Sequence, residues 1–229
     1  MAAVKGDPHA QTELGYRYAT GNEVPINTAK AAIWYRKAAE QGYMVAQTNL
    51  GYAYASGSGV RLNLEEAARW FQKAADQGYD SAQANLGALY LQGMGVPKDH
   101  TKAFELLQKA AAQNNAAAQF NLGLMYDRGF GIKQDYALAR QWYLKAALQN
   151  YPDAQANLGA LYATNNGGPR DFIESYMWTA LAAYRNDSTA VDLLPRLIQQ
   201  LSAEQLEQAK EKVRNWKPKV PAANSSDKK

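Results

Sequence analysis

Apolar residues recur at helical spacing along most of the chain, and the recurrence itself repeats. In the stretch AQANLGALY, the residues Ala82, Leu86 and Tyr90 stand four positions apart, which places them on one face of a helix. The same nine residues return at Ala154–Tyr162. Variants at the intermediate register occupy Ala10–Tyr18, Ala46–Tyr54 and Ala118–Tyr126. A fixed period of 36 residues indicates an array of stacked repeats.

Each unit of the array predicts a helix, a turn and a second helix. In the third unit, Gly93 and Gly95 end the first helix and permit the positive φ that a turn requires. Asp99 suits the N-cap of the second helix. The same cap position holds Asn27, Asn63, Asp135 and Asp171 in the other units. The second helix is expected to bury Ala103, Leu106, Ala110 and Ala111, and the Leu106 position holds Trp34, Trp70, Trp142 and Trp178 elsewhere.

A glycine interrupts the first helix of every unit. A glycine inside a helix costs about 1 kcal/mol relative to alanine. We therefore expect a neighbouring helix to approach so closely that any Cβ would block it. The glycines are Gly15, Gly51, Gly87, Gly123 and Gly159.

The pattern divides the chain into a repeat array with two distinct ends. Five units follow one another without a gap, at 6–41, 42–77, 78–113, 114–149 and 150–185. Residues 1–5 align with the last turn of a second helix, so we expect them to be the remnant of an upstream repeat. Residues 186–216 predict capping helices, with Pro195 as a kink and Ser202 with Gln205 as a capping box. Residues 217–229 are rich in Lys, Pro and Ser and are expected to be disordered.

Composition excludes several classes of function. The chain has no Cys, which removes disulfides, thiolate metal sites and cysteine nucleophiles. Its net charge of +4 comes mostly from residues 217–229, and elsewhere Lys and Arg mix with Glu and Asp, so no nucleic-acid partner is predicted. The apolar runs are too short for a membrane-spanning helix, so no membrane insertion is predicted.

No arrangement of residues predicts a catalytic, cofactor or metal site. The Gly-x-Gly pairs fall at one repeat position and lack the strand-first context of a phosphate loop. The two histidines, His9 and His100, stand in different units and would lack a third metal ligand. We therefore expect no enzyme activity, no cofactor and no bound metal.

The repeated motifs resemble those of a known family. The order A-Q-x-x-L-G-x-x-Y, then G-x-G-V, then A-x-x-W-Y-x-K-A-A is similar to the Sel-one-like repeat family of bacterial type, a relative of tetratricopeptide repeats. The resemblance covers 6–185. It implies a right-handed α-solenoid of helix-turn-helix repeats that binds protein partners without catalysis. The fifth unit departs from the pattern after Tyr162, and its Leu181 replaces the Lys of the other units.

One column of residues, formed by the position directly before the leucine of each repeated motif, predicts contact with a partner. Resemblance to tetratricopeptide domains places its asparagines on the concave face, where they would hydrogen-bond the backbone of an extended peptide. The alternative is that each asparagine ties one repeat to the next, because buried amides are usually satisfied within the protein. Helical geometry brings apolar anchors to the same side. The column holds Asn49, Asn85, Asn121 and Asn157, with Glu13 in the first unit, and the anchors are Tyr16, Tyr52, Phe120 and Leu124.

The sequence thus predicts an all-α solenoid with capping helices that binds a protein or peptide partner. We expect a monomeric scaffold or adaptor. The alternative is a dedicated inhibitor or immunity protein that masks one toxin or enzyme. The compartment stays open, with a periplasmic, cell-envelope or secreted location favoured over a cytoplasmic one.

Overall fold

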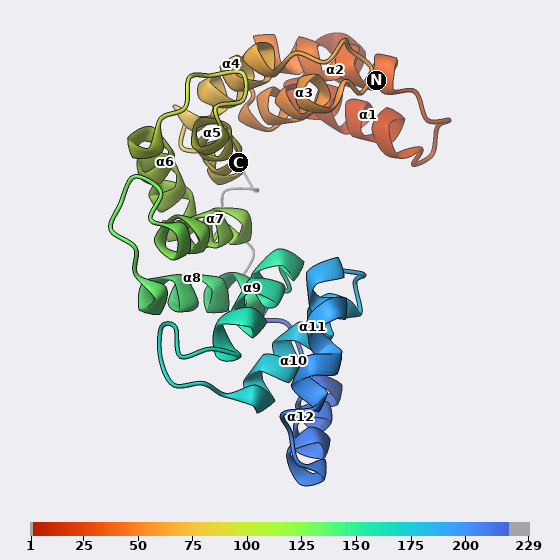
Figure 1. The fold of residues 1–229 in the computed structure, drawn as a ribbon. Helices are drawn as coiled ribbons and strands as arrows, with labels where there is room; N and C mark the ends of the chain where they lie inside the picture. The colour runs from red at the N-terminus through yellow and green to blue at the C-terminus, as the bar shows by residue number, and fades with distance from the viewer. Residues whose placement is uncertain (1, 220–229) are drawn as a thin grey trace. The chain divides into compact units, whose positions relative to one another are not determined.

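The protein is built from helices throughout the part that the structure describes. This computed structural model describes residues 2–219, and in that range the chain forms a short 3₁₀-helix and twelve α-helices (Figure 1). The predicted all-α class is confirmed. Contacts between residues divide the chain into two compact units, Met1–Gln113 and Asn114–Lys229.

The first unit contains three helix pairs in chain order. The helices of a pair pack on each other, and α3 and α5 also pack on the second helix of the preceding pair. The elements are η1 (Ala2–Lys5), α1 (Pro8–Thr20), α2 (Thr28–Glu40), α3 (Met44–Ser56), α4 (Leu64–Ala75), α5 (Asp80–Gln92) and α6 (His100–Ala112).

The second unit contains two further pairs and two terminal helices. Here α7 packs with α8, α9 with α10, and α8 with α9. The elements are α7 (Ala116–Arg128), α8 (Tyr136–Leu148), α9 (Pro152–Tyr162), α10 (Phe172–Ala183), α11 (Ser188–Ile198) and α12 (Ala203–Asn215).

The turn inside each repeat is fixed by glycines and by a capping side chain. In the second repeat, Gly57 and Gly59 have φ of 71° and 74°, in the left-handed region that favours glycine. The Asn63 side chain then accepts a hydrogen bond from the backbone N–H of Glu66 at 3.0 Å and begins α4. All five predicted N-caps are confirmed, at Asn27, Asn63, Asp99, Asp135 and Asp171.

The fifth repeat has a different turn, as its sequence predicted. Helix α9 has 11 residues where α7 has 13, and it ends at Ala163 in a right-handed conformation instead of a left-handed glycine. The loop that follows carries its positive φ angles later, at Gly167 and Gly168.

The predicted close approach at the glycines is confirmed. A Cβ added to Gly87 would lie 2.8 Å from Cγ of Leu107 and 3.4 Å from the backbone oxygen of Ala103. Both atoms belong to the second helix of the same repeat, so the glycine leaves room for that helix. Equivalent contacts join Gly51 to Phe71 and Gly123 to Tyr143.

The prediction that Leu106 and its equivalents face the core was wrong in part. Leu106 is half-buried, and the next residue, Leu107, is fully buried against the glycine. One residue turns a helix by about 100°, so the neighbouring position takes the core direction. Trp34 and Trp142 are half-buried, whereas Trp70 and Trp178 are buried.

Most of these tryptophans are covered by a lysine one turn along the same helix. The ammonium of Lys73 lies 3.9 Å from the ring centroid of Trp70, a cation–π distance. Lys37 over Trp34 and Lys145 over Trp142 repeat the arrangement.

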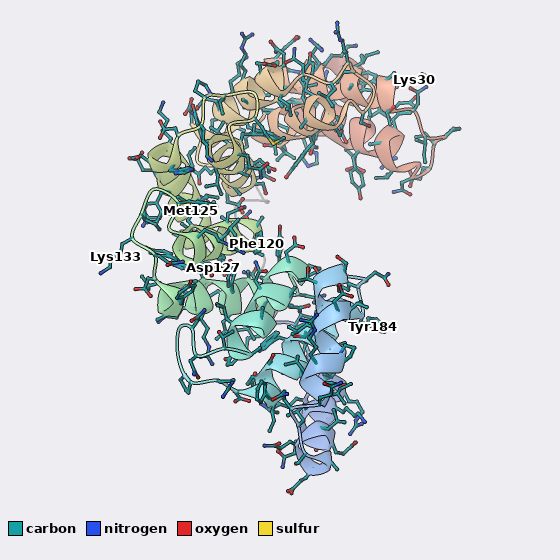
Figure 2. All side chains as sticks on the ribbon, in the orientation of Figure 1. Lys30, Phe120, Met125, Asp127, Lys133 and Tyr184 are labelled. Atoms are coloured by element: carbon teal, nitrogen blue, oxygen red, sulfur yellow. The ribbon has the colours of Figure 1, made fainter. Side chains whose placement is uncertain are left out.

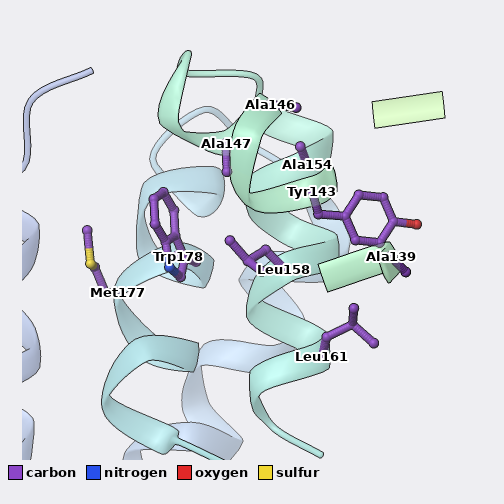
Figure 3. Packing of buried hydrophobic residues seen from close by; sticks show 9 residues of the cluster. All are labelled: Ala139, Tyr143, Ala146, Ala147, Ala154, Leu158, Leu161, Met177 and Trp178. Carbon is purple, nitrogen blue, oxygen red and sulfur yellow. The ribbon is translucent and has the colours of Figure 1, made fainter. Parts of the chain in front are cut away.

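Small residues fill the core between these large ones. Figure 3 shows the cluster in the second unit, where Tyr143, Leu158 and Trp178 pack among buried alanines of α8 and α9. Alanine lets helix backbones approach closely, but it contributes little apolar area per residue. The core is therefore thin, and polar contacts between repeats add to it.

A network of glutamine side chains joins consecutive repeats. Gln47 is 4% exposed, and its Nε2 donates to the backbone oxygen of Ala39 in the preceding repeat at 3.2 Å. Its Oε1 accepts from Nε2 of Gln77, in its own repeat, at 2.8 Å. The same pairing joins Gln11 to Gln41, Gln83 to Gln113 and Gln119 to Gln149.

The fifth repeat lacks the second member of this pair. Gln155 is fully buried and donates to the backbone oxygen of Ala147 at 3.2 Å. Its Oε1 has no hydrogen-bond partner among the described residues. Arg185 stands where the other repeats have the donating glutamine, and its side chain is exposed.

The last helix packs on α10 instead of on α11. The rings of Trp216 and Trp178 meet edge to face at 6.4 Å, and Lys212 pairs with Glu174. In this repeat Leu181 replaces the covering lysine, so the Trp178 ring is open to Trp216. The predicted capping box of Ser202 and Gln205 is confirmed. Pro195 lies inside α11, and the predicted kink stays a prediction.

The predicted disordered tail lies largely outside the described residues. Of 217–229, only Lys217–Lys219 are described, and the N–H of Lys219 donates to the backbone oxygen of Leu148 at 2.7 Å.

Near the N-terminus, Nε2 of Gln11 donates to the backbone oxygen of Ala3, as Nε2 of Gln47 does to that of Ala39.

We expect the substitution Gly87→Ala to destabilise the protein. Overpacking a core typically costs about 1–3 kcal/mol, which exceeds the gain of about 1 kcal/mol in helix propensity. Urea unfolding should therefore show a lower midpoint. In a Leu107→Ala background, where the clashing atoms are gone, the same substitution should raise the midpoint. A stabilising Gly87→Ala in the unaltered chain would contradict the helix contact.

We expect Arg185→Gln to stabilise the protein by about 0.5–1.5 kcal/mol, because it supplies a donor to the Oε1 of Gln155. The backbone at this position matches that of Gln149, since both N–H groups donate to the oxygen three residues before. Arg185→Ala is the matched control, because it removes the same charge without adding a donor. The interpretation fails if the two variants unfold at the same urea concentration.

Candidate partner-binding site

The asparagine column lies on the first helices of the repeats. Asn49 and Asn85 belong to α3 and α5 in the first unit, and Asn121 and Asn157 belong to α7 and α9 in the second. All four side chains are half-buried. Each stands two positions after the buried glutamine and one position before the buried leucine, so it lies at the border between the core and the surface.

Asn85 connects two repeats and is fully engaged as a donor. Its Nδ2 donates to the hydroxyl of Tyr52 in the preceding repeat and to the backbone oxygen of Ser81, both at 2.6 Å. The Tyr52 residue is 46% exposed, and its ring meets the edge of Phe71 at 5.4 Å between centroids. Burial of the hydroxyl end raises the pKa of Tyr52, and the hydrogen bond with Asn85 opposes that rise.

Asn49 has a different environment. Its side chain makes no hydrogen bond with the described residues, and it borders two hollows of about 270 and 210 Å³. The larger hollow lies between α1 and α3 and is lined by His9, Thr12, Glu13, Tyr16, Tyr43, Val45 and Asn49. The smaller is lined by Asn49, Tyr35, Tyr52, Thr28, Ser56, Ser58 and four alanines.

Two tyrosines that line the hollows beside Asn49 differ in exposure. Tyr16 is 51% exposed, whereas Tyr35 is buried beneath Gly15. Burial raises the pKa of Tyr35 to about 12, with smaller contributions from the nearby Tyr16 and Glu13. Tyr35 therefore stays protonated at neutral pH and can donate a hydrogen bond.

In the second unit the predicted site residues make more contacts within the protein. Nδ2 of Asn121 donates to the backbone oxygen of Ala117 at 2.9 Å. The side chain of Asn157 lies near the Tyr143 hydroxyl and lowers its pKa, against the larger rise that burial causes. Phe120, labelled on α7 in Figure 2, packs its ring 5.8 Å from Tyr143 and 5.3 Å from Tyr151. Leu124 is half-buried.

The structure brings the predicted residues of the first unit together and adds others. Tyr16 and Asn49 line one hollow, and Asn49 and Tyr52 line the other. Sequence reasoning missed His9, Tyr43 and Tyr35 as lining residues. The only signal for them was the repeat pattern itself, in which Tyr35 and Tyr43 also fit a purely structural role.

The residues that line the two hollows offer both hydrogen-bonding groups and aromatic surface. They supply an amide, phenol and aliphatic hydroxyl groups, aromatic faces and one carboxylate.

Within residues 2–219 no group of three or more His, Cys, Asp or Glu is placed to hold a metal ion. In the same range no helix combines the length and apolar character that crossing a bilayer requires.

Comparison with protein families agrees with the repeat pattern. The model of the Sel1 repeat matches residues 8–43, 45–79, 80–115, 116–151 and 152–187. No curated protein matches the chain.

Solved structures of similar fold come from several bacteria. A Sel1 repeat protein from Oxalobacter formigenes is 34% identical, with a TM-score of 0.79 over 89% of this chain and 85% of its own. A protective antigen of uropathogenic Escherichia coli is 36% identical, with a TM-score of 0.77 over 92% of this chain. This chain spans only 47% of the length of that antigen.

A third structure shows likeness of fold alone. An immunity protein from Pseudomonas aeruginosa is 21% identical, with a TM-score of 0.56 over 89% of this chain and 80% of its own. The five matched repeats and the two structures above 30% identity decide the family: this chain belongs to the Sel1 repeat family.

Proposed function

We propose that this chain is a scaffold or adaptor that holds an extended segment of a protein partner on the face formed by its first helices. Sel1 repeat proteins are generally protein-interaction scaffolds, and their fold is in general non-catalytic.

One observation carries the proposal. Asn49, with its amide unpaired among the described residues, stands between hollows lined by the exposed rings of Tyr16 and Tyr52. An asparagine amide offers both a donor and an acceptor, which is what a peptide backbone in extended conformation requires. Exposed tyrosines supply apolar contact area of the kind that interfaces favour.

Asn85 and Asn121, which hydrogen-bond within the chain, could also bind a partner segment. Asn85 donates through Nδ2, but its Oδ1 stays available as an acceptor for a partner N–H. Asn121 likewise donates to its own helix. Such bonds orient an amide before a partner arrives, which lowers the cost of binding. The bond between Asn85 and Tyr52 also supports the alternative role of a tie between repeats.

A dedicated inhibitor of one toxin or enzyme is the alternative. The immunity protein from Pseudomonas aeruginosa resembles this chain in fold only, and no side-chain arrangement described above favours an inhibitor over a scaffold. The scaffold is therefore the function that the site supports better.

We expect Asn85→Ala/Asn121→Ala to weaken partner binding by about 1–3 kcal/mol, as for the loss of two hydrogen bonds. Peptides selected from a random display library on the full chain provide the ligand, and fluorescence anisotropy measures affinity. The melting temperature should fall only modestly, because each side chain is half-buried. Gln108→Ala/Gln141→Ala is the matched control, since both glutamines are exposed on second helices.

The outcome that contradicts the proposal is also specific. If affinity is unchanged while the melting temperature drops strongly, the asparagines serve as ties between repeats. The binding surface would then lie on the turns or on the second helices.

A further inference from the structure

Asn49 shares its two hollows with Tyr16 and Tyr35, and the equivalents of these tyrosines interact with the equivalent asparagine in other repeats. One period along, Asn85 donates to Tyr52, and the corresponding pair is Asn49 with Tyr16. Three periods along, the side chain of Asn157 lies near the Tyr143 hydroxyl and lowers its pKa, and the corresponding pair is Asn49 with Tyr35.

Neither interaction is present at Asn49. Its side chain is free of hydrogen bonds within the described part of the chain, and a hollow lies on either side of it. The larger hollow takes in Tyr16 and the smaller takes in Tyr35 and Tyr52. The repeat geometry thus offers this amide two partners, and the first two repeats leave both positions open.

One formal charge lines the two hollows, and it is negative. Glu13 occupies the first place of the asparagine column and is the only residue lining either hollow with a formal charge at neutral pH, counting His9 as neutral. Arg17 pairs with Glu13 at 3.1 Å, but it also pairs with Glu23. The group of two carboxylates and one guanidinium therefore keeps a net charge of −1, and neither Lys nor Arg lines the hollows.

Aromatic faces accompany the carboxylate. The exposed ring of Tyr16 lies on one side, and Tyr43 lines the same hollow with its ring 6.2 Å from that of His9. A cation is attracted both to aromatic faces and to a carboxylate. A volume of about 270 Å³ admits the aliphatic stem and charged end of one long side chain.

We propose that the hollow between Tyr16 and Asn49 receives a lysine or arginine side chain of the partner segment, while Asn49 binds the main-chain amide beside it. The inference rests on the proposed function and adds the chemistry of the partner. The first two repeats would thereby select a basic residue and set the register of the bound segment.

The test exchanges the charge on each side of the contact. Hexapeptides are selected from a random display library on the full chain, and a second version of each replaces its Lys or Arg with norleucine. Affinities for both versions are measured by fluorescence anisotropy with the unaltered chain, Glu13→Gln and Asn49→Ala. Glu105→Gln is the matched control, because this exposed carboxylate on α6 lines neither hollow.

We expect the selected peptides to share a basic residue, and the norleucine version to bind the unaltered chain at least about 5-fold more weakly. With Glu13→Gln that loss should shrink to about twofold or less, because the carboxylate is gone. With Glu105→Gln the full loss should persist. Melting temperatures of all variants, measured beside the affinities, confirm that the chain is folded.

Two results would overturn the inference, and they have different consequences for the proposed function. If peptides bind and Asn49→Ala weakens them, but norleucine binds as well as lysine, the basic partner is wrong and the scaffold function stands. The basic partner is also wrong, and the scaffold function stands, if replacing Lys or Arg with norleucine weakens binding equally in the unaltered chain and in Glu13→Gln. If no peptide is selected, or Asn49→Ala leaves affinity unchanged, the proposed function fails together with the inference.

Discussion

In each of the first four repeats the second helix rests a side chain directly on a glycine in the first, and the other features of the repeat follow from that contact. Leu107 on Gly87 and Tyr143 on Gly123 bring two helix backbones within reach of each other. Alanines on both sides of the contact can then be fully buried, as Ala82 and Ala103 are. The pair packs on one side of the first helix, which leaves its opposite side for other contacts.

A core made largely of alanine leaves the junctions between repeats dependent on polar contacts. At the two junctions of the first unit the buried glutamine, Gln47 or Gln83, donates to the preceding repeat and accepts from its own. A fully satisfied buried network of this kind fixes a single arrangement, because any shift leaves polar groups unpaired. The orphaned oxygen of Gln155 shows the same rule broken where the repeat array gives way to the terminal helices.

Much of the fold could be predicted from the sequence, because caps, glycine turns and helix periodicity are local signals. As their residue types predict, Asn63 and Ser202 cap the starts of helices, and Gly57 ends a helix in a left-handed conformation. What could not be predicted depends on the rotation of one helix against another. Leu106 and Leu107 are equally apolar, and only packing decides which of them meets Gly87. The role of Gln47 was missed because its two partners stand 8 and 30 residues away, in elements whose distance the sequence does not give.

The candidate site was predictable as a column but not as a set of individual environments. Asn49 and Asn85 occupy the same position of the pattern, yet only Asn85 is bonded to a tyrosine. Both helices carry the sequence A-Q-x-N-L-G, so the pattern could not distinguish the two environments. Phe120 stands where Thr48 and Ala84 stand in other repeats, but the aromatic rings of Tyr143 and Tyr151 draw it toward the core.

The constant offsets of the glutamine contacts have a consequence for how such a chain can change in length. Both junctions inside the first unit are made by the same two bonds, at the same two separations along the chain. A 36-residue segment inserted in register between two repeats of one unit would carry its own glutamine pair and meet both neighbours through contacts already in use. Length variation of this kind would add subsites to the first-helix face one at a time, without requiring a new type of junction.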